Sequence, residues 1–323
     1  MKLASALAIA TAMTIASTTP VAAQDGIPGP EQDRYIWLEE ARSDKALDWV
    51  RAENERTMEL LAGDPRYDAV KAEALAIYDS EDRIPYVTIR PDGLYNFWQD
   101  KQNPRGLVRR TTLESYRSDN PQWETVLDVD ALAEAEGREW VYKGSTCLPP
   151  EDRLCMIALS DGGEDATVLR EFDMATRSFV EGGFVLDEKS QGGIEWIDAD
   201  TLLVGRDFGE GTLTESQYPR TARIWKRGTP IEQAEEIWRG EEADVWSSAT
   251  LLRDHTGTAH GYYAFRATSF HETEYFWQHE GEWLRLDMPL KAAPYGLIDG
   301  QLLFSTDVDW ETQGQTFPAD ALV

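Results

Sequence analysis

The hydrophobic pattern near the N-terminal end of the chain is helical. Apolar side chains recur there every three or four positions, which is the spacing of one face of an α-helix. Ser43 is a suitable N-cap for a first helix, and Gly63 ends that pattern. Asp64 and Pro65 suit the start of a second helix that continues to about Ser80. The sequence therefore predicts two consecutive helices, each with an apolar face that requires a partner.

From about Arg83 the hydrophobic period changes to two. Short runs rich in β-branched and aromatic residues alternate with turns that contain Pro, Gly, Asp or Asn. The predicted strands are 86–89, 94–98, 107–111, 124–127, 154–158, 168–172, 201–204, 222–226, 234–238, 261–266, 274–277, 283–286 and 301–305. One short helix, 130–136, interrupts them. The predicted fold class is therefore mainly all-β, preceded by a short α-helical N-terminal segment.

Turn sequences recur among these strands at a longer interval. They centre on Asp92-Gly93, Glu151-Asp152, Ala199-Asp200, Thr256-Gly257 and Asp299-Gly300. The intervals are roughly 40 to 60 residues and each holds about four strands, which is typical of β-propeller blades. We therefore predict a partial propeller of about four to five blades, with a pair of β-sandwiches as the alternative.

Tryptophan is frequent, with twelve residues in the chain. Sheets that stack face to face need large side chains between them, and tryptophans near strands suit that purpose. Eight of them lie on or beside predicted strands: Trp98, Trp123, Trp196, Trp225, Trp238, Trp246, Trp277 and Trp283. We expect these eight to fill the spaces between sheets.

The first 23 residues differ from the rest of the chain. Lys2 precedes an apolar stretch over 3–15, and Val21-Ala22-Ala23 offers small residues for cleavage. This pattern predicts a secretory signal peptide over residues 1–23. The apolar stretch is shorter than the ~20 residues of a membrane span. We therefore expect an exported protein, periplasmic or secreted, with no membrane association after the signal is removed.

Charge and composition argue against several classes of partner. The 323 residues include 31 Lys and Arg against 59 Asp and Glu, a net charge of -28. Such a chain repels phosphate backbones, so we expect no nucleic-acid partner. No glycine-rich loop precedes a helix, so no phosphate-bearing cofactor is expected. His271 begins a segment similar to a zinc-protease motif, but Tyr275 stands where the second histidine belongs, and we predict no metal site.

The two cysteines lie close together in the sequence. Cys147 and Cys155 flank a turn-rich segment between apolar runs. Across a hairpin they would face each other, and an oxidising compartment would allow a disulfide between them. The alternative is a pair of buried free thiols, because the sequence does not show how far apart their backbones lie.

Several motifs resemble those of the prolyl oligopeptidase-type serine peptidases. The segment Asp33-Arg34-Tyr35-Ile36-Trp37-Leu38-Glu39-Glu40, followed by Ala46 to Asn54 and by Thr57, is similar to the N-terminal signature of that family. Further similar segments are 92–95, 106–111 and 123–128, which resemble its first propeller blade, and 159–165, which resembles its second. The resemblance extends over most of the chain after Asp33.

The resemblance implies a two-part enzyme. The family joins a seven-bladed propeller to an α/β-hydrolase domain, which combines a short N-terminal helical segment with a long C-terminal region. It cleaves peptides, often after proline, and the propeller covers the active site and restricts entry to short peptides. By this resemblance, residues 24–81 form the helical segment that packs on the hydrolase domain, and residues 82–323 form an incomplete propeller.

The sequence departs from the family in its catalytic motif. A nucleophile elbow requires Gly-x-Ser-x-Gly, and the chain contains none. The nearest match, Gly144-Ser145-Thr146-Cys147, lacks the second glycine and lies among strands. We therefore assign no catalytic residue and expect the hydrolase domain to be absent. The chain is interpreted as the N-terminal part of an exported serine endopeptidase, with short peptides and the missing hydrolase domain as its partners.

Two alternatives to the peptidase interpretation remain. The first is a stand-alone propeller that binds peptides or proteins without catalysis. The second is a propeller glycosidase that uses two acids, because propellers also support that chemistry. Carboxylate pairs such as Asp198 with Asp200, or Asp307 with Asp309, suit it by type, but such pairs are also typical of solvated turns in so acidic a chain.

Overall fold

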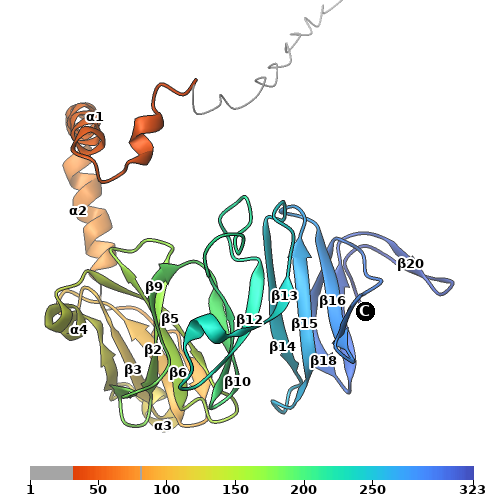
Figure 1. Ribbon diagram of the computed structural model, residues 1–323. Helices are drawn as coiled ribbons and strands as arrows, with labels where there is room; N and C mark the ends of the chain where they lie inside the picture. The colour runs from red at the N-terminus through yellow and green to blue at the C-terminus, as the bar shows by residue number, and fades with distance from the viewer. Residues whose placement is uncertain (1–31, 81) are drawn as a thin grey trace, which may run out of the picture. The chain divides into compact units, whose positions relative to one another are not determined.

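The computed structural model describes residues 32–80 and 82–323 (Figure 1). The predicted signal peptide, residues 1–23, lies outside the described residues. The chain divides into two compact units, the first ending at Tyr78 and the second running from Asp79 to Val323. No helix within the described ranges is long and apolar enough to cross a membrane.

The first unit consists of helices with exposed apolar faces. It contains η1 (Ile36–Glu39), α1 (Asp44–Ala62) and α2 (Tyr67–Tyr78). The Ser43 hydroxyl accepts a hydrogen bond from the Ala46 N–H at 3.2 Å, which confirms the predicted N-cap. In contrast, large apolar side chains of both helices are exposed: Trp49, Val50, Met58, Leu60, Leu61, Val70, Leu75, Ile77 and Tyr78. Within residues 32–78, these faces stay exposed and no neighbouring element covers them.

The second unit begins with two antiparallel sheets. The first sheet contains β1 (Thr88–Arg90), β2 (Gly93–Trp98), β3 (Leu107–Thr111) and β4 (Glu124–Asp128). The second sheet contains β5 (Trp140–Cys147), β6 (Leu154–Asp161), β7 (Thr167–Asp173) and β8 (Ser178–Phe179), and β9 (Val185–Ser190) also pairs with β7. The short helices α3 (Leu113–Tyr116) and α4 (Val129–Glu136) flank β4.

Three further sheets follow in the same order. The third contains β10 (Gly193–Asp198), β11 (Thr201–Gly205), β12 (Thr221–Lys226) and β13 (Glu235–Arg239), with η2 (Ile231–Gln233) before β13. The fourth contains β14 (Trp246–Arg253), β15 (Ala259–Ala267), β16 (Thr273–His279) and β17 (Glu282–Arg285). The fifth contains β18 (Ala292–Ile298), β19 (Gln301–Thr306) and β22 (Ala321–Leu322), and the hairpin β20 (Trp310–Thr312) and β21 (Gln315–Phe317) lies between β19 and β22.

The five predicted turns divide the second unit into repeating sheets. Each turn joins the first strand of a sheet to the second, from Asp92-Gly93 in the first sheet to Asp299-Gly300 in the fifth. Every sheet is therefore an antiparallel meander that begins with one of these hairpins. The second unit thus contains five successive meanders, as the predicted partial propeller requires.

The first strands of neighbouring sheets form a common inner edge. β10 lies against β5 and β14, and β14 lies against β18. The Trp196 indole N–H donates to the Thr146 carbonyl at 2.9 Å, and Arg253 donates to the carbonyls of Trp196 and Ile197. The remaining strands of each sheet extend outward from this edge, and Figure 1 shows the sheets standing in sequence within the second unit. This is the radial arrangement of propeller blades.

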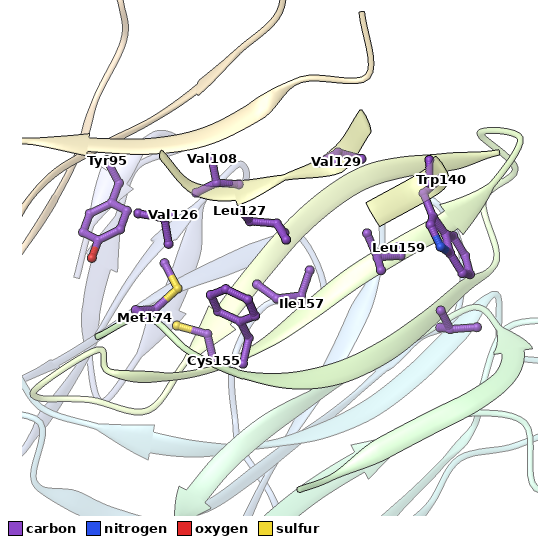
Figure 2. Packing of buried hydrophobic residues seen from close by; sticks show 13 residues of the cluster. Tyr95, Val108, Val126, Leu127, Val129, Trp140, Cys155, Ile157, Leu159 and Met174 are labelled. Carbon is purple, nitrogen blue, oxygen red and sulfur yellow. The ribbon is translucent and has the colours of Figure 1, made fainter. Parts of the chain in front are cut away.

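Strands buried on both faces build the cores between sheets. Along β6, Cys155, Ile157 and Leu159 contribute to the core shared with the first sheet, whereas Met156 contributes to the core shared with the third. Successive side chains of a strand point to opposite faces, so one strand serves two interfaces. Figure 2 shows the first of these cores, where Val108 lies among the same residues.

The structure corrects two expectations. The pattern predicted most second and third strands of the sheets but missed four of the five first strands: β5, β10, β14 and β18. It also missed β9 and the short strands β8, β20, β21 and β22. Trp196, Trp225 and Trp238 are buried between sheets as expected, but Trp246 is 48% exposed at the start of β14. Trp246 therefore does not fill the space between sheets.

Candidate functional site

A cavity of about 400 Å³ opens between the third and fourth sheets, where β10 and β14 begin. Its walls include Gly193 on β10, Gly205 on β11 and Ser248 on β14. These positions carry small side chains or none, so the two sheets do not fill the space between them. Gly192, which also lines the cavity, must be a glycine: its φ is +90°, and a Cβ there would overlap the Gly205 carbonyl oxygen.

Three aromatic side chains form one wall of this cavity. Trp246 packs against Phe265 with ring centroids 5.0 Å apart at 66°. Tyr218 is positioned by its own loop, in which Thr214 N–H donates to the Tyr218 carbonyl at 2.8 Å. Tyr218 and Trp246 are 40% and 48% exposed, so their rings remain available to a ligand. We call the cavity and these three aromatic residues the Trp246 cleft.

A second cavity adjoins the Trp246 cleft. It measures about 650 Å³ and shares Tyr218, Trp246 and Phe265 with the first cavity. Its other residues are largely apolar and include Tyr275 and Pro294. Concave, mostly apolar cavities with a few polar groups are the usual form of ligand sites. The two cavities together make the start of β14 the candidate binding site of the second unit.

One carboxylate of the Trp246 cleft has no cationic partner. Glu195 lies on β10, and its Oε2 accepts hydrogen bonds from the Leu251 N–H at 2.8 Å and from the Thr250 hydroxyl. Across the described residues, no Lys, Arg or His side chain lies within ion-pair distance of Glu195. By contrast, the buried Glu171 carboxylate accepts from both terminal nitrogens of Arg227, at 2.8 and 3.0 Å.

The two cysteines lie on neighbouring strands of the second sheet. Cys147 ends β5 and pairs in register with Cys155 of β6, and a disulfide joins the two residues. Arg90 of the first sheet contacts both sulfur atoms and donates to the Ser145 hydroxyl at 2.9 Å. Trp246 is the first residue of β14, whereas Cys147 is the last residue of β5. The disulfide therefore lies at one end of the inner edge, and the Trp246 cleft lies at the other.

The residues weighed for catalysis do not come together. Ser145 contacts Arg90 and no histidine ring bonds to it in the described part of the chain. His260 does pair with Asp254, at 2.7 Å between Nε2 and Oδ2, and this hydrogen bond lowers the pKa of Asp254. No serine hydroxyl completes that pair within residues 82–323. No cluster of three or more His, Cys, Asp or Glu suited to a metal ion occurs among the residues that the structure describes.

The sequence pattern did not indicate the residues of the Trp246 cleft. Trp246 was interpreted as a filler, and Glu195, Tyr218 and Phe265 were not singled out. Small residues in the sequence could have indicated the cavity: Gly192 and Gly193 precede Glu195, and Ser-Ser-Ala follows Trp246. Small side chains at the start of first strands leave room where the sheets meet.

Comparison with known proteins assigns the family. A family model described as "Prolyl oligopeptidase, N-terminal beta-propeller domain" matches residues 21–307. The chain belongs to the prolyl oligopeptidase family. An uncharacterized peptidase of Sinorhizobium fredii is 42% identical over 297 residues, which are 90% of this chain and 41% of that protein. An uncharacterized peptidase of Rickettsia prowazekii is 28% identical over 309 residues, covering 92% of this chain and 42% of that protein.

Solved prolyl oligopeptidase-family structures share the fold of this chain. A structure described as a post-proline cleaving enzyme from Rickettsia typhi superimposes with a TM-score of 0.82 and 27% identity, over 91% of this chain and 44% of that one. Oligopeptidase B from Leishmania major superimposes with a TM-score of 0.62 at 14% identity, over 84% of this chain and 38% of that one, which shows the fold alone. The prediction of a prolyl oligopeptidase-type propeller is confirmed, and the paired-sandwich alternative is wrong.

The chain spans about two fifths of the length of the curated relatives it matches. The activity and substrates of those longer proteins are therefore assigned to this chain only as a proposal.

Proposed function

We propose that this chain is the propeller part of an exported serine endopeptidase that cleaves short peptides. The observation that carries the proposal is the family match over residues 21–307 together with the five meanders around one inner edge. In this proposal the nucleophile, acid and histidine belong to a C-terminal hydrolase domain. The relatives named as peptidases and as a post-proline cleaving enzyme support peptide hydrolysis as the reaction.

The proposed task of the propeller is to control which substrates reach the hydrolase domain. In this proposal the inner edge borders the route to the hydrolase domain, and that route admits an extended peptide more readily than a folded protein. The Trp246 cleft supports this proposal, because it offers an aromatic surface at one end of that edge. Aromatic side chains bind peptide segments with little loss of conformational entropy.

The first unit supports the proposed hydrolase partner. Leu60 is 79% exposed on α1, and Ile77 is 67% exposed on α2. Apolar faces of this kind mark interaction sites when no other part of their own unit covers them. We propose that these helices pack on the hydrolase domain, as the corresponding segment does in the family.

The sequence and the disulfide support export. Residues 1–23 have the three regions of a secretory signal peptide. The disulfide between Cys147 and Cys155 suits the periplasm or the extracellular space, because cytosolic thiols are kept reduced. These features support our proposal that the mature protein lies outside the cytoplasm.

A chimaera tests the proposed function. In the Sinorhizobium fredii relative, the segment that matches this chain would be replaced by the corresponding residues of this chain, which are 42% identical to it. We expect the chimaera to hydrolyse a blocked short peptide and to leave casein largely intact. The same chimaera with its hydrolase nucleophile changed to alanine is the control.

Two results would contradict the proposal. A folded chimaera that hydrolyses no peptide would favour the stand-alone binding module. A chimaera that degrades casein as readily as the short peptide would show that the propeller does not restrict access.

A further inference from the structure

We infer that the cavity between the third and fourth sheets binds the cationic side chain of a lysine or arginine in a peptide, with Glu195 as its counter-ion. The inference rests on the proposed function for one point, namely that the ligand is a peptide. It goes beyond that function by assigning a charge preference to the propeller itself.

The first argument is the missing partner of Glu195. Two fully buried carboxylates of the second unit are bonded to arginine, Glu171 to Arg227 and Asp244 to Arg266 at 2.9 and 3.0 Å, whereas the partly buried Glu195 is not. Glu195 accepts only from the neutral donors Leu251 N–H and Thr250 hydroxyl, and both bonds reach the same oxygen, Oε2. An ionised carboxylate can accept more bonds than these, so Oε1 is left for a ligand.

The second argument is the aromatic wall. Cations bind favourably over the faces of Trp, Tyr and Phe rings. This chain already uses that interaction, since the Arg109 guanidinium lies 4.2 Å from the Trp98 ring and 4.3 Å from the Trp123 ring. Within the described ranges no Lys or Arg of the chain itself lies over Trp246. A ligand cation would therefore meet a ring face and a carboxylate in one cavity.

The third argument concerns size and charge. The cavity of about 400 Å³ lies within the range of small-ligand sites, and the adjoining apolar cavity of about 650 Å³ offers space for the neighbouring residue of the peptide. The net charge of -28 attracts cationic peptides over a distance. A neutral side chain in the first cavity would cover the partly exposed Glu195 from water without giving it a cationic partner, which costs free energy.

A metal ion does not fit this cavity as well as an organic cation. Calcium takes six to eight oxygen ligands, several of them carboxylates. Glu195 is the only acidic residue among those that line the cavity. The aromatic wall and the single carboxylate suit an ammonium or guanidinium group instead.

Binding of matched peptides to the 323-residue chain tests the inference. The probes are acetyl-Gly-Lys-Gly-amide and the same peptide with norleucine in place of lysine, which keeps the aliphatic stem and removes the charge. Isothermal titration calorimetry should show that the wild-type chain binds the lysine peptide about tenfold more tightly. In Glu195→Gln this preference should fall to about one, because the amide keeps an acceptor for Leu251 but carries no charge.

Two further variants keep the test falsifiable. Glu235→Gln removes one charge from an exposed position of the same sheet outside the cavity, and it should retain the preference for lysine. Trp246→Leu changes an exposed side chain and should weaken binding of the lysine peptide about threefold or more. Matching circular dichroism spectra would show that each variant is folded.

The inference is wrong if the wild-type chain binds both peptides equally, or if Glu195→Gln keeps the preference. Either result leaves the proposed function untouched, because the chimaera can still hydrolyse an uncharged short peptide. Conversely, a lysine preference that depends on Glu195 supports the cation site even if the chimaera is inactive. The two experiments therefore fail independently.

Discussion

Two interfaces of the propeller are built from the same elements but filled differently. Between the second and third sheets, Phe184 lies 5.9 Å from Trp196 and 4.9 Å from Trp225, measured between ring centroids. Between the third and fourth sheets, Trp238 packs against Phe276 and Trp283, but a cavity of about 400 Å³ remains where β10 and β14 begin, beside Ala249. A cavity of about 740 Å³ also lies between the second and third sheets, so each interface combines packed and open regions. The difference therefore lies between two positions: we call the packed surroundings of Trp196 the filled interface and the surroundings of Trp246 the open interface.

The largest expected effect is a loss of stability at the filled interface. Trp196 is 1% exposed, so Trp196→Ala should cost about 3 to 5 kcal/mol of unfolding free energy through lost burial and a new cavity. Urea denaturation followed by circular dichroism measures this. Trp246→Ala is the matched control at the open interface, and it should cost less than about 1 kcal/mol. Equal losses at the two positions would remove the contrast between the interfaces.

The next largest loss of stability is expected from removing the disulfide. Replacing Cys147 and Cys155 together with serine should lower the unfolding free energy by roughly 2 to 3 kcal/mol, because the crosslink restricts the unfolded chain. The lysine peptide should still bind, since the disulfide lies at the other end of the inner edge. Mass spectrometry after alkylation of the wild-type chain supplies the control. Full alkylation without a reductant would show free thiols and contradict this prediction.

A paired carboxylate should stabilise the fold in a pH-dependent way. The hydrogen bond from Arg153 lowers the pKa of Asp173 below its ordinary value. A group with a lowered folded-state pKa contributes stability above its unfolded pKa, near 3.9, and that contribution is lost as the pH falls through the folded pKa. Asp173→Asn should therefore cost about 1 to 2 kcal/mol at pH 7 and progressively less below pH 4. Urea titrations at several pH values measure the difference.

Two control variants accompany the Asp173 experiment. Asp187→Asn, at a carboxylate that is 72% exposed, should change stability little at any pH. Glu195→Gln should also change it little, because Glu195 has no cationic partner to lose. A pH-independent cost for Asp173→Asn would show that packing, and not the ionised carboxylate, is responsible.

The smallest expected change in stability comes from filling the open interface. Ser248→Leu places a larger apolar side chain beside Gly205, among the residues that line the cavity. The unfolding free energy should change by less than about 1 kcal/mol. Binding of the lysine peptide should be lost, because the cavity is occupied. A Ser248→Leu variant that binds the peptide normally would show that the peptide lies elsewhere.

The sequence predicted the strands that are buried on both faces. Strands such as β6 and β11 have apolar residues on both faces, and hairpin turns with glycine or aspartate mark their ends. These features are local and strong, so the five hairpins and the propeller repeat could be predicted. The first strands β10 and β14 carry glycine, serine and threonine among apolar residues, so neither the alternation nor the composition indicates a strand.

The candidate site could not be predicted for a related reason. Glu195 and Trp246 lie on different sheets, and only the packing of the third sheet against the fourth brings them to one cavity. Whether a carboxylate has a cationic partner depends on the tertiary structure. Among the 59 acidic residues, the sequence gave no reason to select Glu195. Glu195 and Trp246 lie on first strands that the pattern missed, because the small residues that leave the cavity also weaken the strand signal.

Fluorine NMR of the chain labelled with 5-fluorotryptophan tests the contrast between the two interfaces most directly. The Trp196 and Trp246 signals are assigned by their loss in single phenylalanine variants. Titration with acetyl-Gly-Lys-Gly-amide should shift the Trp246 signal to saturation and leave the Trp196 signal in place. A Trp246 signal that does not move, or a Trp196 signal that moves as far, would contradict the account.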